Sequence, residues 1–297
     1  MDDLLHDLDI PHACDVPLAP HTWYRLGGPA RILAHPRDAA QLSSLVKRCH
    51  DTRTRFYVLG SGANLLVADE GVDGVVIRLD APAFSQVTID GTRLVAGAGA
   101  DLMKLVMQTA RAGLAGLEVL AGIPATVGGA VRMNAGGAHG DIGQNVRRVR
   151  VMDETGEAYD RFSDDLVFEY RRTNIVAPLI LEAEFELEAD DPQELSRRVK
   201  EIFFYKKSTQ PMGENSPGCA FKNPSDTVGA SAGKLIDDAG LKGYAHGGAM
   251  VSQQHANFIV ARDGATAADV IAVLEHVQNT VFEKTGVKLQ REVVIWP

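Results

Sequence analysis

A short loop late in the chain combines a thiol with a cation and an amide. It contains Cys219, Lys222 and Asn223, and it is bounded by Pro217 and Pro224. A free thiol has a pKa of about 8.5, so it is mostly protonated at neutral pH and can donate a proton. The lysine and the amide could bind an anion beside it. The loop therefore predicts a reaction centre with a proton donor, although a lone cysteine is also often a small buried apolar residue.

Glycine-rich loops earlier in the chain predict a phosphate-bearing cofactor. The loop 60–65, Gly-Ser-Gly-Ala-Asn-Leu, follows an expected strand, and glycines at such a place let backbone N–H groups approach a phosphate. It is not a Rossmann fingerprint, because Leu65 replaces the third glycine. Any single loop of this kind could be only a tight turn, but the glycine-rich segment 122–130 cannot offset its folding entropy by packing alone. A ligand lying along the backbone explains it more simply, and together with the thiol this indicates a redox enzyme with a proton-transfer step.

The bulk composition is that of an acidic globular protein. The 297 residues are 45% hydrophobic and 23% charged, with a formal net charge of −9, which argues against nucleic-acid or anionic-membrane partners. Three widely spaced cysteines, Cys14, Cys49 and Cys219, fit neither a disulfide framework nor a zinc site, so we expect a reducing, cytoplasmic compartment and no metal. The acidic N-terminus does not resemble a signal peptide. No apolar run approaches the ~20 residues that cross a bilayer, so we expect no membrane insertion.

The elements that must position these loops follow from the periodicity of the apolar residues. Helices are expected at 37–50, 101–112, 191–207 and 266–285, with Asp101 and Thr266 as N-caps and Gly286 as the stop. Strands are expected at 56–59, 75–79, 179–187 and 292–296, with a hairpin that begins at about 146. The pattern breaks near 188–195. The prediction is an α+β chain with domains 1–190 and 191–297, the first composed of subdomains of about 1–80 and 81–190.

Several motifs resemble, in the same order, those of the UDP-N-acetylenolpyruvoylglucosamine reductase (MurB) family. They extend from about residue 20 to 295 and comprise His21-Thr22-Trp23, Gly27-Gly28-Pro29-Ala30, 58–67, 116–118, 122–124, 127–130, 133–136, Phe168-Glu169-Tyr170-Arg171 and the thiol loop. The resemblance implies a two-lobed FAD-binding domain of the vanillyl-alcohol-oxidase (PCMH-like) type and a C-terminal α+β substrate-binding domain. No tyrosine-bearing insertion precedes the thiol loop, so the chain resembles the shorter type of the family.

The resemblance also implies a reaction. The family uses FAD and NADPH to reduce UDP-N-acetylglucosamine enolpyruvate to UDP-N-acetylmuramate for peptidoglycan synthesis, with hydride transferred from flavin N5. The resulting enolate lies next to a carboxylate, so it needs fixed positive charge and then a proton. By similarity, Arg171 polarises the carboxylate, Glu292 lies near the same group, and Cys219 donates the proton at a position that is serine in many members. Glu292 would be protonated there, or would orient another donor.

The binding residues implied by the resemblance fall into two sets. The residues expected to hold FAD are Gly60, Ser61, Gly62, Ala63, Asn64 and Leu65 around the pyrophosphate and Ile123, Gly128, Gly129, Asn134 and Ile180 around the flavin. The residues expected to hold the substrate are Tyr170, Tyr205, Lys222, Asn223 and His255. His255 and Asn257 could equally be structural hydrogen-bonding residues. We expect a monomer or a weak oligomer.

Two other functions remain open at this point. A flavin-dependent oxidase of the same architecture, acting on a neutral sugar or alcohol, would explain the first lobe but not a set of residues suited to an acid, namely Arg171, Lys222 and Glu292. A nucleotide-sugar-binding module without redox chemistry would explain the second lobe alone. A yellow purified protein would exclude this last possibility.

Overall fold

The computed structural model describes residues 4–225 and 228–297, which form two compact units. Unit 1 contains the described residues up to Asp15, together with Arg31–Ser61 and Asp73–Phe204. Unit 2 contains Val16–Ala30, Gly62–Val72 and the described residues from Tyr205 to Pro297. These units are defined by contacts between residues, and each contains several separate chain segments. They do not test the expected domains 1–190 and 191–297, which remain a prediction.

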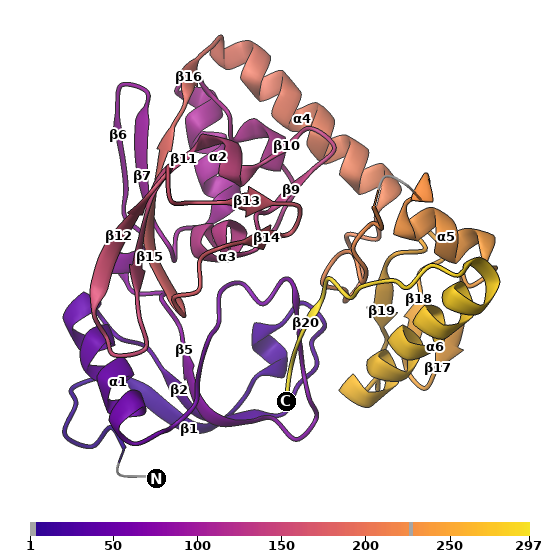
Figure 1. Ribbon diagram of the computed structural model, residues 1–297, viewed down its shortest axis with the longest axis horizontal. Coiled ribbons are helices and arrows are strands. Elements are labelled where there is room, and N and C mark those ends of the chain that lie inside the picture. The colour runs from indigo at the N-terminus through magenta and orange to yellow at the C-terminus, as the bar shows by residue number, and fades with distance from the viewer. Residues whose placement is uncertain (1–3, 226–227) are drawn as a thin grey trace. The chain divides into compact units, whose positions relative to one another are not determined.

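An antiparallel five-stranded sheet forms the centre of unit 1. Its order is β12 (Ala158–Phe162), β11 (Val146–Met152), β15 (Leu179–Glu186), β7 (Arg93–Gly97) and β6 (Val87–Asp90). Val149 pairs with Ala183, and both are fully buried because alternate side chains of paired strands share one face. The helix α3 (Val127–Arg132) packs against β15 and β7, and α2 (Leu102–Arg111) lies beside it (Figure 1). The hairpin expected from residue 146 is confirmed as β11 and β12.

A second sheet and a helix complete the first part of unit 1. The sheet has the order β1 (His12–Pro17), β2 (Pro29–Ala34), β5 (Val72–Ile77) and β3 (Phe56–Val58). The strands β3 and β5 run in parallel, and the chain between them contains β4. The helix α1 (Ala39–Asp51) begins at Asp38, whose carboxylate accepts from the Gln41 N–H at 2.9 Å. It buries one apolar face, as its sequence periodicity predicts.

Short elements connect these sheets. The single-turn 3₁₀ helices are η1 (Ala19–His21), η2 (Pro82–Phe84), η3 (Glu118–Leu120) and η4 (Ile142–Asn145). The two-residue strand pairs are β9 (Gly136–Gly137) with β10 (Gly140–Asp141), β13 (Phe168–Glu169) with β14 (Arg172–Thr173), and β8 (Leu114–Ala115) with β16 (Glu188–Ala189).

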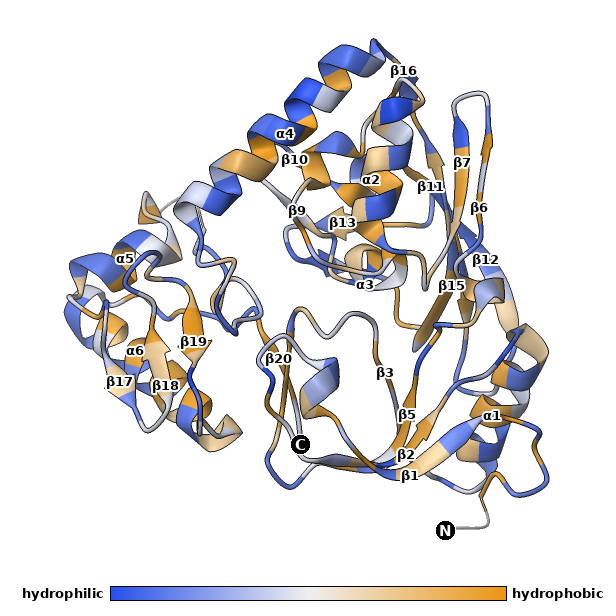
Figure 2. Cartoon of the chain, turned by 180° about the vertical axis from the view of Figure 1, so that it is seen from behind, coloured by the Kyte–Doolittle hydropathy of each residue, from blue (hydrophilic) through white to orange (hydrophobic). Residues whose placement is uncertain are grey.

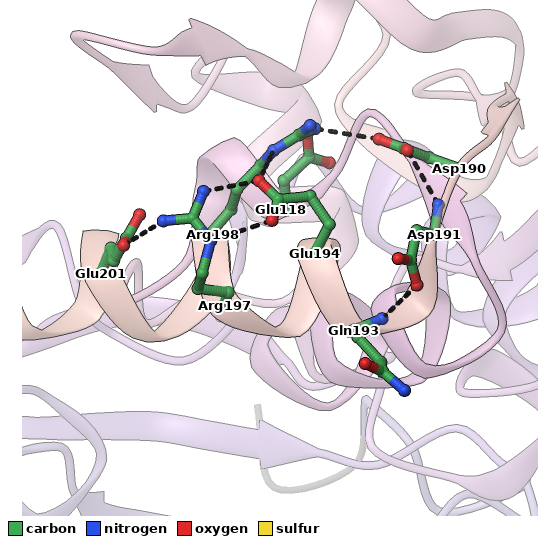
Figure 3. Close-up of polar contacts among 8 residues, drawn as sticks. All are labelled: Glu118, Asp190, Asp191, Gln193, Glu194, Arg197, Arg198 and Glu201. Atoms are coloured by element: carbon green, nitrogen blue, oxygen red, sulfur yellow. Dashed lines mark hydrogen bonds and ion pairs between the residues drawn. The ribbon is translucent and has the colours of Figure 1, made fainter.

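The long helix α4 (Pro192–Thr209) is fixed to unit 1 at its N-terminal end by ion pairs (Figure 3). The Arg198 guanidinium lies 3.0 Å from a carboxylate oxygen of Asp190 and 4.0 Å from one of Glu118. Glu118 is only 8% exposed and also accepts from the Gly116 N–H at 2.6 Å. A buried carboxylate is tolerated only when it is paired and hydrogen-bonded, so this cluster fixes the start of α4 against η3.

Unit 2 contains a three-stranded antiparallel sheet with two helices. The sheet consists of β17 (Ala245–His246), β18 (Ala249–Val251) and β19 (Ile259–Ala261), and Figure 2 shows most of β18 and β19 as hydrophobic. The helix α6 (Ala267–Thr285) packs on this sheet and also contacts α5 (Ala232–Asp238). Separately, β4 (Leu65–Val67) pairs in parallel with the terminal strand β20 (Val294–Trp296).

Three side chains define the start of α6. Thr266 and Asp269 form a capping box at the start of the helix. At its other end, Gly286 stops the helix in a left-handed conformation with a φ of 72°. The carboxylate of Asp69, two residues after β4, accepts from the N–H groups of Ala267 at 2.8 Å and Ala268 at 3.0 Å. The loop after β4 is therefore fixed to the positive end of the α6 dipole.

The expected helices correspond to α1, α2, α4 and α6, and the expected strands are confirmed within a few residues. Asp101 caps α2 by accepting from the Lys104 N–H at 2.8 Å, as its sequence predicts. Within residues 4–225 and 228–297, the structure has no helix long and apolar enough to cross a membrane.

The role of Asp69 can be tested by substitution. Asp69→Ala is expected to lower the free energy of unfolding by about 1–2 kcal/mol, because two N–H groups in the first turn of α6 lose their acceptor. Urea unfolding of the wild type and the variant measures the difference. Asp263→Ala, at an exposed position in the loop before the same helix, is the control. An equal loss in both variants would show that the Asp69 hydrogen bonds do not stabilise α6.

Candidate active site

A cavity of about 320 Å³ lies within unit 1. The loop after β3, the N-terminal turn of α3 and the start of β15 contribute to its wall. Five of the residues expected to hold a cofactor line this cavity: Gly60, Ser61, Gly128, Gly129 and Ile180. These predicted residues therefore share one cavity of unit 1.

Glycine is required in this wall because backbone segments approach closely. A Cβ on Gly60 would lie 2.8 Å from Oγ1 of Thr126, and a Cβ on Gly128 would lie 2.8 Å from the Ala98 Cβ. A Cβ on Gly99 would lie 1.8 Å from a backbone oxygen. Gly60, Gly99 and Gly128 all line the cavity, and at Gly99 the close packing by itself excludes a side chain.

The N–H groups of the glycine loop differ from those at the start of α3 in whether they donate to a protein acceptor. Among the residues that the structure describes, the N–H groups of residues 60–64 donate to no protein acceptor. In the first turn of α3, the Val127 N–H and the Gly128 N–H donate to backbone oxygens at 2.9 and 2.8 Å, and the Gly129 N–H donates to Oγ1 of Thr126 at 3.3 Å. The donors that remain for an anionic ligand therefore belong to the loop and not to the helix.

The predicted loop continues from unit 1 into unit 2 after Ser61. Gly62 has a φ of +66°, and a Cβ there would lie 2.1 Å from the His21 carbonyl oxygen, so only glycine fits. The Asn64 side chain donates through Nδ2 to the Glu292 carbonyl oxygen at 3.0 Å. Leu65 is buried as the first residue of β4. The second half of the loop is thus fixed by contacts within unit 2.

Two acidic side chains, Asp80 and Asp101, line the cavity of unit 1, and each has a neighbouring polar partner. Asp101 accepts from the Lys104 N–H as the N-cap of α2. Asp80 lies 2.9 Å from Nδ1 of His35 and 3.4 Å from Nε of Arg78. Arg78 therefore offsets the negative charge of Asp80 in the cavity wall, whereas Asp101 accepts from a neutral backbone N–H.

Arg132, at the end of α3, adds positive charge to the same wall. Its guanidinium donates to the carbonyl oxygens of Ile175 and Ala177, each at 2.5 Å. Burial lowers the pKa of Arg132 below its ordinary value, but arginine remains charged near neutral pH. The side chain therefore both supports the segment before β15 and supplies a fixed charge. Our sequence prediction did not include this residue.

The other two predicted flavin neighbours have structural contacts. Asn134 is 1% exposed, has a φ of 43°, and its amide links two elements. Nδ2 donates to the Glu169 carbonyl oxygen at 2.9 Å, and Oδ1 accepts from the Gly143 N–H at 3.0 Å. Ile123 is partly buried and packs against the core of unit 1. Asn134 thereby positions the hairpin of β13 and β14.

Arg171 lies in the two-residue turn of that hairpin, next to Tyr170. It has a left-handed φ of 54°, and its Nη2 donates to the Gly136 carbonyl oxygen at 2.7 Å. Its guanidinium carbon lies 5.0 Å from the centroid of the Tyr170 ring, which is a cation–π distance. Tyr170 itself is 52% exposed. The turn thus holds a cation and an accessible phenol in fixed positions in unit 1.

The thiol segment of unit 2 lies next to the residue expected to assist it. Cys219 is partly exposed. The next residue, Ala220, accepts from the Glu292 N–H at 2.8 Å and donates to the Asn257 carbonyl oxygen at 2.7 Å. Since the Glu292 carbonyl also accepts from Asn64, one hydrogen-bonded network joins the predicted site residues Glu292 and Asn64 to Ala220, the residue after Cys219.

Among the predicted substrate residues of unit 2, Lys222 and Asn223 follow Cys219 along the chain, and Tyr205 precedes it. The Lys222 N–H donates to the Gln290 carbonyl oxygen at 2.8 Å, and the side chain is partly buried. Oδ1 of Asn223 accepts from the Ala232 N–H at 3.0 Å, at the first residue of α5. Tyr205, near the end of α4, is 62% exposed. The backbone around Lys222 and Asn223 is thus well ordered by its own contacts.

His255 is a half-buried neutral imidazole. Its Nδ1 lies 3.2 Å from the Asn257 N–H and must accept that hydrogen, so the proton of the neutral ring lies on Nε2. Its ring packs edge-on against Phe258, with centroids 4.8 Å apart. Burial, and to a lesser extent the charge of Lys242, lowers the pKa of His255 below its ordinary value.

Comparison with known proteins identifies the class first. Residues 30–160 match the family described as the FAD binding domain. A cholesterol oxidase from Brevibacterium sterolicum has the same fold, with a TM-score of 0.50 at 14% identity over 61% of this chain and 38% of that chain. The chain is therefore a flavoprotein of the FAD-binding α+β class, and the expected fold class is confirmed.

The particular family follows from the rest of the chain. Residues 210–296 match the UDP-N-acetylenolpyruvoylglucosamine reductase C-terminal domain. The reductases of Heliobacterium modesticaldum and Desulfosudis oleivorans are 44% and 43% identical, over 93% and 95% of this chain and 88% and 93% of theirs. The crystal structure of the reductase (MurB) from Thermus caldophilus has a TM-score of 0.82 at 38% identity, over 97% of this chain and 99% of that chain. The chain belongs to the UDP-N-acetylenolpyruvoylglucosamine reductase family, as its motifs predict.

The pKa of His255 predicts a dependence of stability on pH. Because the folded pKa is lowered, the unfolded chain binds a proton here as the pH falls below about 6.5, whereas the folded protein does not. Stability should therefore decrease from about pH 6.5 downward through the folded pKa. In His255→Gln, the acid decrease in the unfolding midpoint should be smaller than in the wild type. His50→Gln, at an exposed helix position, is the control; wild-type behaviour of His255→Gln would contradict the prediction.

Proposed function

We propose that this protein uses FAD and NADPH to reduce UDP-N-acetylglucosamine enolpyruvate to UDP-N-acetylmuramate, a step of peptidoglycan synthesis. The names of relatives that match almost the whole chain support this activity. The observation that carries the proposal is the thiol segment of unit 2, where Cys219 adjoins the residue that hydrogen-bonds Glu292. A cytoplasmic location and a monomeric or weakly oligomeric state remain predictions from the sequence.

The residues of the glycine loop fit the cofactor. FAD carries two phosphates, and the N–H groups of Gly60 and Ser61 lie at the cavity without an internal acceptor among the described residues. Arg132 and Arg78 supply positive charge in the same wall. The volume of about 320 Å³ falls at the lower end of ligand cavities, so the cavity would hold part of FAD. When bound, FAD supplies the hydride that it receives from NADPH.

Arg171 would stabilise the negative charge that develops on the substrate. The enolpyruvyl group already carries a carboxylate, and hydride addition adds an enolate beside it. A guanidinium is always charged and presents a planar pair of donors suited to a carboxylate. The contacts of Arg171 with Gly136 and Tyr170 fix the guanidinium in advance, so little reorganisation is needed as the charge forms.

Cys219 would then deliver the proton. The S–H bond breaks as a C–H bond forms at the substrate carbon, and the thiolate recovers its proton from solvent. A thiol is a much stronger acid than the serine hydroxyl of many relatives, which favours this transfer. Glu292, held to Ala220 through its N–H, would lie near the substrate carboxylate and is proposed to act in its protonated form or to orient a donor.

The polar groups around the thiol segment would bind the UDP portion. Lys222 and Asn223 are proposed to contact the diphosphate, because an ammonium and an amide suit phosphate oxygens. Tyr205, Tyr170 and His255 are proposed to contact the substrate as well. His255, as the neutral Nε2–H tautomer, is suited to donate a hydrogen bond to an acceptor on the substrate.

An anaerobic flavin assay tests the function. The purified protein should be yellow, NADPH should bleach the flavin absorbance, and UDP-N-acetylglucosamine enolpyruvate should restore it rapidly. A colourless protein that cannot be loaded with FAD contradicts the cofactor assignment. Flavin that is reduced but never reoxidised by this substrate contradicts the substrate assignment.

The same assay tests the proton donor. Cys219→Ala should leave flavin reduction by NADPH unchanged and slow reoxidation by the substrate about 10²–10⁴-fold, the range for loss of a general acid. Cys14→Ala, which removes the exposed cysteine, should behave as the wild type in both half-reactions. Undiminished reoxidation in Cys219→Ala would falsify the donor role.

A further inference from the structure

Asn257 is a buried amide that the proposed chemistry does not use. It is 3% exposed and lies between β18 and β19. Its carboxamide makes two hydrogen bonds to one residue: Oδ1 accepts from the Phe221 N–H at 3.0 Å, and Nδ2 donates to the Phe221 carbonyl oxygen at 2.8 Å. A buried amide is costly unless it is paired, and this one is paired with the second residue after Cys219.

The main chain of Asn257 continues the same contact. Its carbonyl oxygen accepts from the Ala220 N–H at 2.7 Å, and Cys219 and Phe258 form an antiparallel bridge. The carboxamide of Asn257 therefore takes the place of a peptide group in a neighbouring strand. It extends the pairing of the thiol segment from Ala220 to Phe221.

The opposite side of the thiol segment is paired as well. Phe221 and Arg291 form a second antiparallel bridge. The Glu292 N–H donates to the Ala220 carbonyl oxygen, and the Lys222 N–H donates to the Gln290 carbonyl oxygen, both at 2.8 Å. The segment 219–222 is thus paired on both sides through isolated bridges, and at Phe221 the pairing on one side is made by the side chain of Asn257.

We propose that Asn257 is a positioning residue for the Cys219 thiol. The inference rests on the proposed function, in which Cys219 donates the proton. With the backbone fixed on both sides, the position of Sγ depends on the side-chain torsion of Cys219 alone. Loss of the carboxamide removes both partners of Phe221 on that side and allows the backbone next to the thiol to move. Displacement of a reacting group by about 1 Å can cost about 10²-fold in rate.

Thiol alkylation tests this inference without relying on turnover. In a Cys14→Ser background, iodoacetamide reports on Cys219, because Cys49 is buried and its burial raises the pKa of that thiol to about 11. Asn257→Ala should alkylate about tenfold faster at Cys219, with a shifted pH profile, and the Phe221 amide should lose about tenfold in hydrogen-exchange protection. Asn215→Ala, an exposed position on the same connection from α4, should match the parent.

The half-reactions supply a second readout. In Asn257→Ala, NADPH should reduce the flavin at the parent rate, whereas reoxidation by UDP-N-acetylglucosamine enolpyruvate should slow about 10²-fold with little change in KM. A residue that only stabilises the fold would instead lower the unfolding midpoint and leave the alkylation profile unchanged.

Two results overturn the inference. One is parent-like alkylation and exchange at residues 219–222 in folded Asn257→Ala, whatever its turnover. If Asn257→Ala does not fold, Asn257→Asp replaces it, because this variant keeps the acceptor for the Phe221 N–H but loses the donor to the Phe221 carbonyl. The second result that overturns the inference is a parent-like alkylation rate and parent-like hydrogen exchange in Asn257→Asp. If the parent itself shows no turnover, the proposed function fails, while alkylation and exchange still decide the role of Asn257.

Discussion

The parallel pairing of β4 with β20 is the interaction on which the site of unit 2 depends. Three residues after the glycine loop pair with three near the end of the chain, Leu65 opposite Val294 and Trp296 opposite Val67. This register brings Asn64 to the Glu292 carbonyl, and Glu292 in turn bonds Ala220 beside the thiol. A shift of one residue would point every side chain of β20 to the opposite face, and it would also move the Glu292 carbonyl away from Asn64.

The sequence predicts the regular elements well, because their signals are local. The apolar stripe and caps of α6 lie within about 20 residues, and the alternation of β15 is visible in eight. The partner of a strand is not a local property, which explains why β20 was expected as a strand but its pairing with β4 was not. The strand β1 was also missed, since its side chains are mostly exposed and show no alternation.

Residues of the candidate site could be predicted from the sequence where the residue type has few structural roles. Gly60 and Ser61 were expected to hold a cofactor because glycines after a strand permit close approach to a ligand; both line the cavity, and their contact with FAD stays a prediction. Asparagine is less informative from sequence, since its amide serves ligands and backbone equally well. The position of Asn134 beside the flavin stays a prediction, and its amide also links the Glu169 and Gly143 backbones. Arg132 was missed because only the tertiary fold brings it to the cavity. The N-cap of α3 is different, because Thr126 directly precedes Val-Gly-Gly and so has a local sequence signature.

The β4–β20 pairing also has a consequence for synthesis of the chain. Its two strands are roughly 230 positions apart, so they form one of the most non-local contacts available to a chain of this length. Domains generally fold as they emerge, N-terminal parts first. The second half of the glycine loop therefore lacks its strand partner through most of translation. The network that joins this loop to the thiol segment can be completed only after Glu292 has left the ribosome.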